Sequence, residues 1–128
     1  MARPLTDRTA KIARIDVPLP PHIVEAIQHL VAVRNREGGS GHKRLYARDL
    51  HEEAIAELLQ QAGAGKRILF LATQTTKTPR KPLWIDADLK AGVDDLWVRH
   101  GFSRSSIVLT ALHGYLDRRG LLSGALAA

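Results

Sequence analysis

The chain has 128 residues and lacks cysteine altogether. This absence excludes disulfide bonds and cysteine-ligated zinc sites, and it favours a cytoplasmic setting. The sequence also lacks any apolar run of the roughly 18 residues that a membrane-spanning helix needs. Its start, Met1–Arg14, mixes Arg, Lys, Asp and Thr and has no apolar segment of the kind found in signal peptides. We therefore expect a soluble cytoplasmic protein without membrane contacts.

Complete catalytic and metal-binding motifs are also missing. The segment "QAGAGKR", Gln61–Arg67, is similar to a phosphate-binding loop but lacks its earlier glycine and has Arg67 where Ser or Thr would bind magnesium. His51 and Glu52 lie on a predicted helix without the second histidine of a metalloprotease motif. The six histidines show no metal-ligand spacing. We expect a protein that is not an enzyme and holds no metal or other cofactor.

The charge balance is basic, with 19 Lys and Arg against 13 Asp and Glu and a formal net charge of +6. Such a balance favours an anionic partner, nucleic acid among them. The segment Gln61–Ile85 carries no acidic residue and five basic ones, Lys66, Arg67, Lys77, Arg80 and Lys81. A chain of this length predicts one compact domain, 1–128, with little room for a separate catalytic unit.

The first part of the chain, residues 11–61, predicts a strand and two helices. Apolar residues alternate over Arg14–Leu19, which is typical of a strand with one buried face. Pro20-Pro21 ends the strand and opens a helix with apolar residues at helical spacing, Ile23, Ile27, Leu30 and Val31. A glycine-rich loop follows from Gly38. A second helix is predicted over Arg48–Gln61, with an apolar face of Leu50, Ala54, Ile55, Leu58 and Leu59.

The same order of elements returns in residues 80–119, after a basic linker at 62–79. Alternation over Lys81–Ile85 predicts a strand, and Asp86 or Asp88 can cap a helix with apolar positions Leu89, Val93, Leu96 and Trp97. Gly101-Phe102-Ser103 predicts the end of that helix and the N-cap of a new one. The last helix turns inward Ile107, Val108, Ala111, Leu112, Tyr115 and Leu116, and an apolar tail, 120–128, follows. A half with one strand cannot bury its own apolar face, so the two halves are expected to pack on each other.

The segment "GFSRSSIVLTALHGYL", Gly101–Leu116, resembles the turn and second helix of the ribbon-helix-helix DNA-binding family. The first half is similar but looser, in "RIDVPLPPHIVEAI", Arg14–Ile27, and "RDLHEEAIAELL", Arg48–Leu59, because a longer loop, Gly38–Tyr46, replaces the tight turn. The resemblance implies a mainly α fold with a two-stranded antiparallel ribbon. It also implies an intramolecular pseudo-dimer, similar to the tandem single-chain members known from T-DNA border binding and plasmid transfer.

That resemblance implies sequence-specific binding of double-stranded DNA through a ribbon in the major groove. The role would be that of a transcriptional regulator or of an accessory factor in plasmid or T-DNA processing and transfer. The alternative is a protein-interaction module with the same fold, antitoxin-like or recruiting a partner of a transfer or regulatory complex. In either case we expect a monomer that acts as a pseudo-dimer.

Base contacts are expected from the outward side of the ribbon. If Ile15, Val17, Leu19, Leu83 and Ile85 face the core, the outward residues are Arg14, Asp16, Pro18, Arg80, Pro82 and Trp84. We expect Arg14 and Arg80 to contact guanine, and Asp16 to accept from a cytosine amino group. Trp84 is either a base contact or a packing residue. A register slip by one residue would turn Lys81 outward and Trp84 inward.

Phosphate contacts are expected at the starts of the second helices. In the second half, Ser103, Arg104 and Ser105 lie at a helix N-terminus, whose amides and dipole favour an anion. In the first half, Lys43, Arg44 and Arg48 are expected to supply the equivalent contact through charge. Because the halves differ, we expect an imperfect or non-palindromic DNA site.

Overall fold

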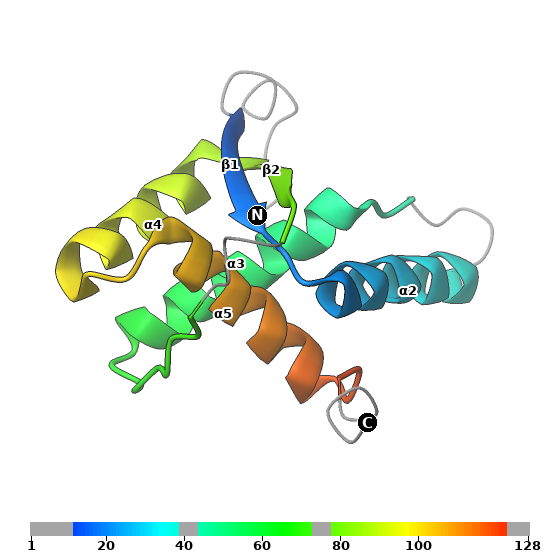
Figure 1. Ribbon diagram of the computed structural model, residues 1–128. Coiled ribbons are helices and arrows are strands. Elements are labelled where there is room, and N and C mark those ends of the chain that lie inside the picture. The colour runs from blue at the N-terminus through cyan, green and yellow to red at the C-terminus, as the bar shows by residue number, and fades with distance from the viewer. Residues whose placement is uncertain (1–11, 39–43, 73–77, 123–128) are drawn as a thin grey trace.

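A computed structural model of the chain describes residues 12–38, 44–72 and 78–122 (Figure 1). Strand, helix and helix follow one another twice, which confirms the expected mainly helical fold with a two-stranded antiparallel sheet. The elements are β1 (Ile12–Pro18), α2 (Pro21–Gly38), α3 (Ala47–Gly63), β2 (Arg80–Asp86), α4 (Ala87–His100) and α5 (Arg104–Arg118). No helix in the described ranges is long and apolar enough to cross a membrane.

The two strands pair with each other, so that the ribbon itself joins the two halves of the chain. Arg14 lies opposite Trp84, and Asp16 lies opposite Pro82. On β2 the side chains of Leu83 and Ile85 are buried, whereas Trp84 is 49% exposed. The register with Trp84 outward is therefore the one that forms, and the alternative that turned Trp84 inward is wrong. Lys81 is also exposed, at the start of the strand.

Two positions, one on each strand, are equivalent in the repeat when they lie the same number of residues before the helix that follows. Asp16 precedes the first residue of α2 by five positions, and Pro82 precedes the first residue of α4 by five. These two equivalent residues face each other at the middle of the ribbon. Arg14 and Arg80 each precede their helix by seven positions, so they occupy equivalent places on either side of that middle.

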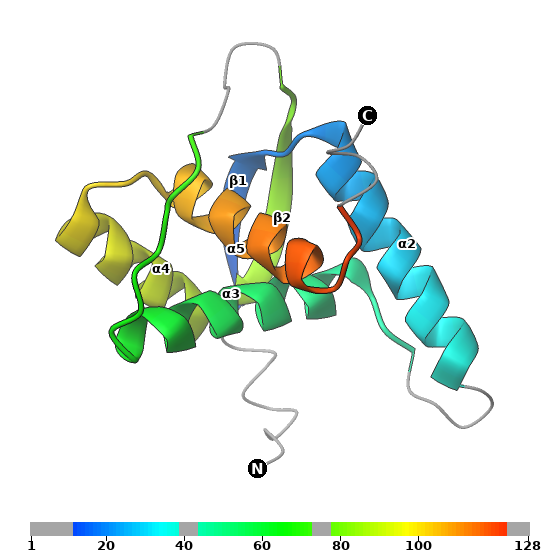
Figure 2. The same ribbon diagram turned by 90° about the horizontal axis from the view of Figure 1, so that it is seen from below.

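The core lies beneath the ribbon and is built from both halves. Helix α5 packs against β1, helix α3 packs against β2, and α3 and α5 pack on each other (Figures 1 and 2). Ribbon residues Ile15, Val17 and Ile85 belong to the same buried cluster as residues of both second helices. Each large aliphatic side chain buried in this way contributes roughly 1.5–3 kcal/mol.

The ends of α4 and the start of α5 are fixed by local signals. The Asp86 carboxylate accepts a hydrogen bond from the Asp88 backbone N–H at 2.8 Å, so Asp86 is the cap. Gly101 ends α4 in the left-handed conformation, with φ at 77°. The Ser103 hydroxyl accepts from the Ser106 N–H at 3.1 Å and caps α5. The predicted stop and new cap at this turn are confirmed.

Three residues differ from their expected environment. Pro18 is buried rather than outward, because β1 ends there and the alternation of sides ends with it. Trp97 is 42% exposed rather than part of the core, since it lies at the edge of the apolar face of α4. Leu122 was expected in the tail, but it is buried, because the chain turns at Gly120 (φ 72°) and returns to the core.

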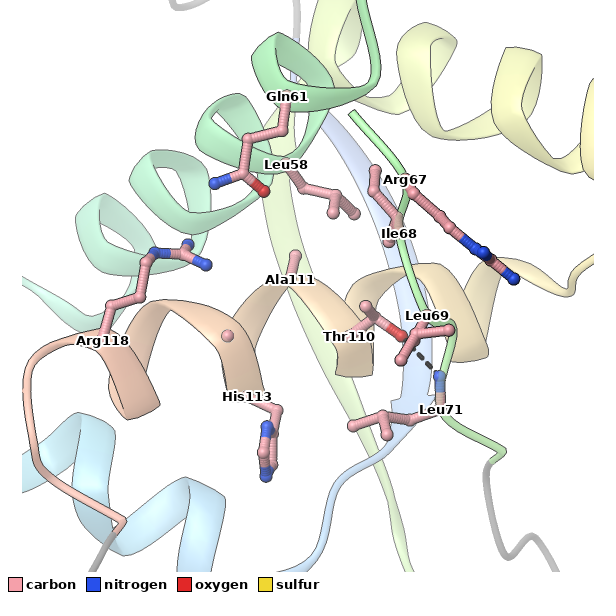
Figure 3. A pocket seen from close by; sticks show the side chains of 11 residues that line it. Leu58, Gln61, Arg67, Ile68, Leu69, Leu71, Thr110, Ala111, His113 and Arg118 are labelled. Atoms are coloured by element: carbon pink, nitrogen blue, oxygen red, sulfur yellow. Dashed lines mark hydrogen bonds between the residues drawn. The ribbon is translucent and has the colours of Figure 1, made fainter. Parts of the chain in front are cut away.

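The segment after α3 crosses α5 and is attached to it by hydrogen bonds (Figure 3). The Leu71 N–H donates to the Thr110 hydroxyl at 2.8 Å, and the Ser106 hydroxyl donates to the Leu71 carbonyl. The Phe70 ring stacks on Phe102 with centroids 4.5 Å apart. The amphipathic pattern predicted a single buried face for α5, yet Ser106 and Thr110 are also buried, at a place where this segment binds the helix.

Candidate nucleic-acid interface

Exposed polar side chains on the outer side of the ribbon form one connected cluster. The Arg14 Nε donates to Asp16 Oδ1 at 2.9 Å, and its Cζ lies 5.6 Å from the centre of the Trp84 ring. The Arg80 Nη1 donates to the backbone carbonyl of Asp16 at 3.0 Å. The four residues expected to contact bases therefore lie together and face outward.

A hollow of about 290 Å³ lies beside the ribbon, and we call it the ribbon hollow. It joins side chains of the strands to α4 and to the start of α5. It is lined by Arg14, Ile15, Asp16, Arg80, Lys90, Trp97, Ser103, Arg104 and Ser105. Four of these residues are basic and one is acidic, and this balance favours an anion. Residues predicted separately as base contacts and as phosphate contacts thus share one surface.

The start of α5 contributes backbone donors to the ribbon hollow. The Ser103 hydroxyl uses the N–H of Ser106, and the helix geometry leaves the N–H groups of Arg104 and Ser105 without a partner inside the helix. The first turn of α5 contains no acidic residue. Ser103 is exposed, whereas Ser105 is buried, so the Ser103 hydroxyl is the more accessible of the two.

Arg104 is held in place by groups on α4 that were not predicted as site residues. Its guanidinium lies 4.4 Å from the centre of the Trp97 ring, and its Nε is hydrogen-bonded to Asp94. Lys90 also donates to Asp94, at 3.1 Å. Burial raises the pKa of Asp94, but the hydrogen bonds from Arg104 and Lys90 outweigh it and hold the pKa below its ordinary value. The spacing of Lys90, Asp94 and Trp97 on one helix stripe was a signal that could have identified them.

Arg44 and Arg48, from the phosphate set expected in the first half, do not line the ribbon hollow. Arg44 is exposed, with its Cζ 5.9 Å from the Tyr46 ring, and Arg48 pairs with Glu52 at 3.3 Å. Lys43 lies outside the described residues. Phosphate contact by these residues stays a prediction.

The start of α3 is electrostatically unlike the start of α5. Its first turn carries Asp49, whose carboxylate accepts the Tyr46 N–H at 2.8 Å. A carboxylate at this end of the helix already interacts with the dipole and repels a second anion. The two second helices therefore present different N-termini to a polyanion.

The hollow on the β2 side, which we call the apolar hollow, has a volume of about 210 Å³. It is bounded by β2, α2 and the start of α3, as the ribbon hollow is bounded by β1, α4 and the start of α5. It is lined by Leu19, Val24, Ile27, Gln28, Ala47, His51, Lys81, Pro82 and Leu83. Burial lowers the pKa of His51 to about 4, so its imidazole is neutral at pH 7. Lys81 is then the one charged residue in that lining.

A further hollow of about 220 Å³ lies under the segment after α3 (Figure 3). Two of its polar side chains, those of Thr110 and Arg118, are already engaged. Thr110 accepts from Leu71 and donates to the Ser106 carbonyl, while Arg118 pairs with Glu57. In the described part of the chain, no group of three His, Cys, Asp or Glu residues is placed to hold a metal ion. We interpret this hollow as a packing gap beneath the crossing segment.

The ribbon hollow is thus the place where four basic side chains, the start of α5 and the outer side of the ribbon meet. The fold of this one chain brings these groups together. No protein-family model, curated protein or solved structure matches the chain.

Proposed function

We propose that this protein binds double-stranded DNA, with the ribbon in the major groove and the two halves acting as a single-chain ribbon-helix-helix pseudo-dimer. The observation that carries the proposal is the ribbon hollow, which joins the outward ribbon arginines to the start of α5. A major groove about 12 Å wide admits a two-stranded ribbon. The order of elements and the antiparallel pairing of β1 with β2 support the same proposal.

The residues divide into two roles in this proposal. Arg14 and Arg80 contact base edges from the outer side of the ribbon, where guanine offers two acceptors to a guanidinium. Ser103, Arg104 and the first amides of α5 contact a phosphate, with Lys90 adding charge. Phosphate contacts fix position and affinity, whereas base contacts read the sequence.

The proposed DNA contact is unequal on the two sides. Beside β1, the ribbon hollow offers cations and a helix start without acidic residues. Beside β2, the apolar hollow adjoins a helix start that carries Asp49. We therefore propose a non-palindromic DNA site, as suits either a transcriptional regulator or an accessory factor in plasmid or T-DNA transfer.

The first test is fluorescence anisotropy on a labelled duplex across a salt series. Phosphate contacts by Lys90 and Arg104 predict that the logarithm of the association constant falls with the logarithm of salt concentration with a slope of roughly −2. The double variant Arg14→Ala/Arg80→Ala removes the proposed base contacts, so it should weaken binding by about 1–3 kcal/mol for each contact and change the slope little. The matched control is Arg36→Ala/Arg67→Ala, which removes the same charge from exposed residues outside the ribbon hollow. Absence of binding even at low salt would refute the proposal.

The start of α5 is tested separately by Ser103→Asp. Aspartate is as good a cap as serine, so the helix should remain intact, while its charge repels a phosphate. We expect roughly tenfold weaker DNA binding than in the neutral cap variant Ser103→Asn, with no loss of thermal stability. Equal affinities of the two variants would exclude this helix start as the phosphate contact.

A protein-interaction module is the second candidate. It is favoured by exposed apolar side chains near the end of α4, where Val98 is 80% exposed and Trp97 and Phe102 are each 42% exposed. Exposed apolar patches often mark protein contacts. If the protein does not bind DNA, this alternative predicts that Val98→Glu abolishes binding to a partner protein.

A further inference from the structure

We infer that Asp16 and Trp84 are positioning residues that aim the Arg14 guanidinium at a guanine, so that the Arg14 end of the ribbon reads a G·C pair more selectively than the Arg80 end. This inference rests on the proposed function and names the residues that make one of the two guanine contacts the more selective. It also gives Asp16 a role different from the one expected from the sequence.

Arg14 is constrained from two directions. Asp16, two residues along on the same side of β1, accepts from its Nε at 2.9 Å. Trp84, directly opposite on β2, places its ring 5.6 Å from the Arg14 Cζ. Cross-strand neighbours of this kind interact directly, and a guanidinium is attracted to an aromatic face.

The hydrogen bond to Nε leaves the useful end of the guanidinium available. Both terminal nitrogens lie beyond Nε, and they form the fork that matches O6 and N7 of guanine. Holding a flexible arginine in one orientation reduces the conformational entropy that it loses on binding. Asp16 and Trp84 therefore favour bidentate contact without touching the base.

Arg80 occupies the equivalent position but lacks both supports. The residue opposite it is Pro18, which is buried and has no aromatic ring. Its Nη1, one of the two fork nitrogens, already donates to the Asp16 carbonyl at 3.0 Å. This bond uses one of the two N–H groups of Nη1 and turns that end of the Arg80 guanidinium toward the ribbon backbone. Of the two equivalent arginines, Arg14 is therefore better oriented than Arg80 for bidentate contact with guanine.

The two possible roles of Asp16 make opposite predictions about base preference. As an acceptor from a cytosine amino group, Asp16 would impose a preference for cytosine at its own position. As a support for Arg14, it strengthens a preference for guanine at the position that Arg14 reads. Removing its negative charge also removes a repulsion from DNA, so affinity for unrelated duplexes should hold or rise.

The experiment is selection from a randomised duplex pool, read by sequencing, with the full-length protein and matched variants. The wild type should prefer guanine at one position, and Arg14→Ala should abolish that preference. Asp16→Ala and Trp84→Leu should each weaken it by about two- to fivefold, and Trp84→Phe should weaken it less. The control Asp95→Ala removes the acid of another exposed Asp–Arg pair, outside the ribbon hollow, and should leave the base preference unchanged.

A duplex with 7-deazaguanine at the selected position provides a readout of the contact itself. Loss of N7 should weaken the wild type more than it weakens Asp16→Ala, because the variant uses the fork less. A wild type without base preference would overturn the inference. So would an unchanged guanine preference in Asp16→Ala and Trp84→Leu, or the loss of a cytosine preference in Asp16→Ala. Failure of every variant and the wild type to bind any duplex would instead refute the proposed function.

Discussion

Tyr115 is fully buried, and its hydroxyl donates to Glu53 on α3 at 2.8 Å. Burial raises the pKa of Tyr115, and the hydrogen bond with Glu53 raises it further, so the hydroxyl remains a donor at neutral pH. Tyr115→Phe removes this bond between the second helices of the two halves. We expect a loss of about 1 kcal/mol in the free energy of unfolding, measured by urea denaturation. Tyr46→Phe, at a residue 60% exposed, should cause no loss, and equal effects of the two variants would contradict the interpretation.

His51 makes stability depend on pH. Burial lowers its pKa to about 4, whereas the unfolded imidazole titrates near 6.5. The unfolded state therefore binds the proton first as pH falls. The contribution of His51 is fully present above pH 7 and is lost between about pH 6.5 and pH 4, to a total of about 3 kcal/mol.

The measurement is urea denaturation at several pH values across that window. His51→Gln should flatten the decline in stability toward low pH. The control His29→Gln, on the exposed side of α2, should leave the decline unchanged. An unchanged pH dependence in His51→Gln would show that other groups cause the decline.

At the scale of elements, the junction of α4 and α5 depends on one glycine. Gly101 has a φ of 77°, which an L side chain adopts only at a cost of about 1–2 kcal/mol. Gly101→Ala should lower the free energy of unfolding by about that amount. The control Gly63→Ala, at the last residue of α3 where an added Cβ meets nothing within 4 Å, should not destabilise the protein. Thermal unfolding of both variants checks this: destabilisation of Gly101→Ala alone indicates strain at the junction, whereas equal destabilisation of both variants indicates that alanine is poorly tolerated in general.

At the scale of the whole molecule, each strand pairs with the strand of the other half. Since α3 and α5 also pack on each other, one chain already contains both partners of the ribbon and of the core. We expect a monomer of 14.1 kDa by light scattering, with an unfolding midpoint that does not change on dilution. A mass twice that value, with a concentration-dependent midpoint, would indicate strands exchanged between chains.

Several elements could be predicted because their signals are local. Alternating apolar residues set both strands, Pro21 opens α2, and Asp86 and Ser103 cap the helices that follow them. Such features depend on neighbours within a few positions along the chain. For the same reason, the sequence identified Arg14 and Ser103 as candidates for contacts.

Other features depended on residues distant in the chain. Which side of β2 faces outward, the exposure of Trp97, and the attachment of Leu71 to α5 were decided by tertiary packing. The sequence by itself determined the repeated strand-helix-helix order, the caps and the basic charge. Only the tertiary structure decided that the ribbon arginines and the start of α5 share one hollow, because burial and pairing are set by whichever surfaces meet when the two halves pack.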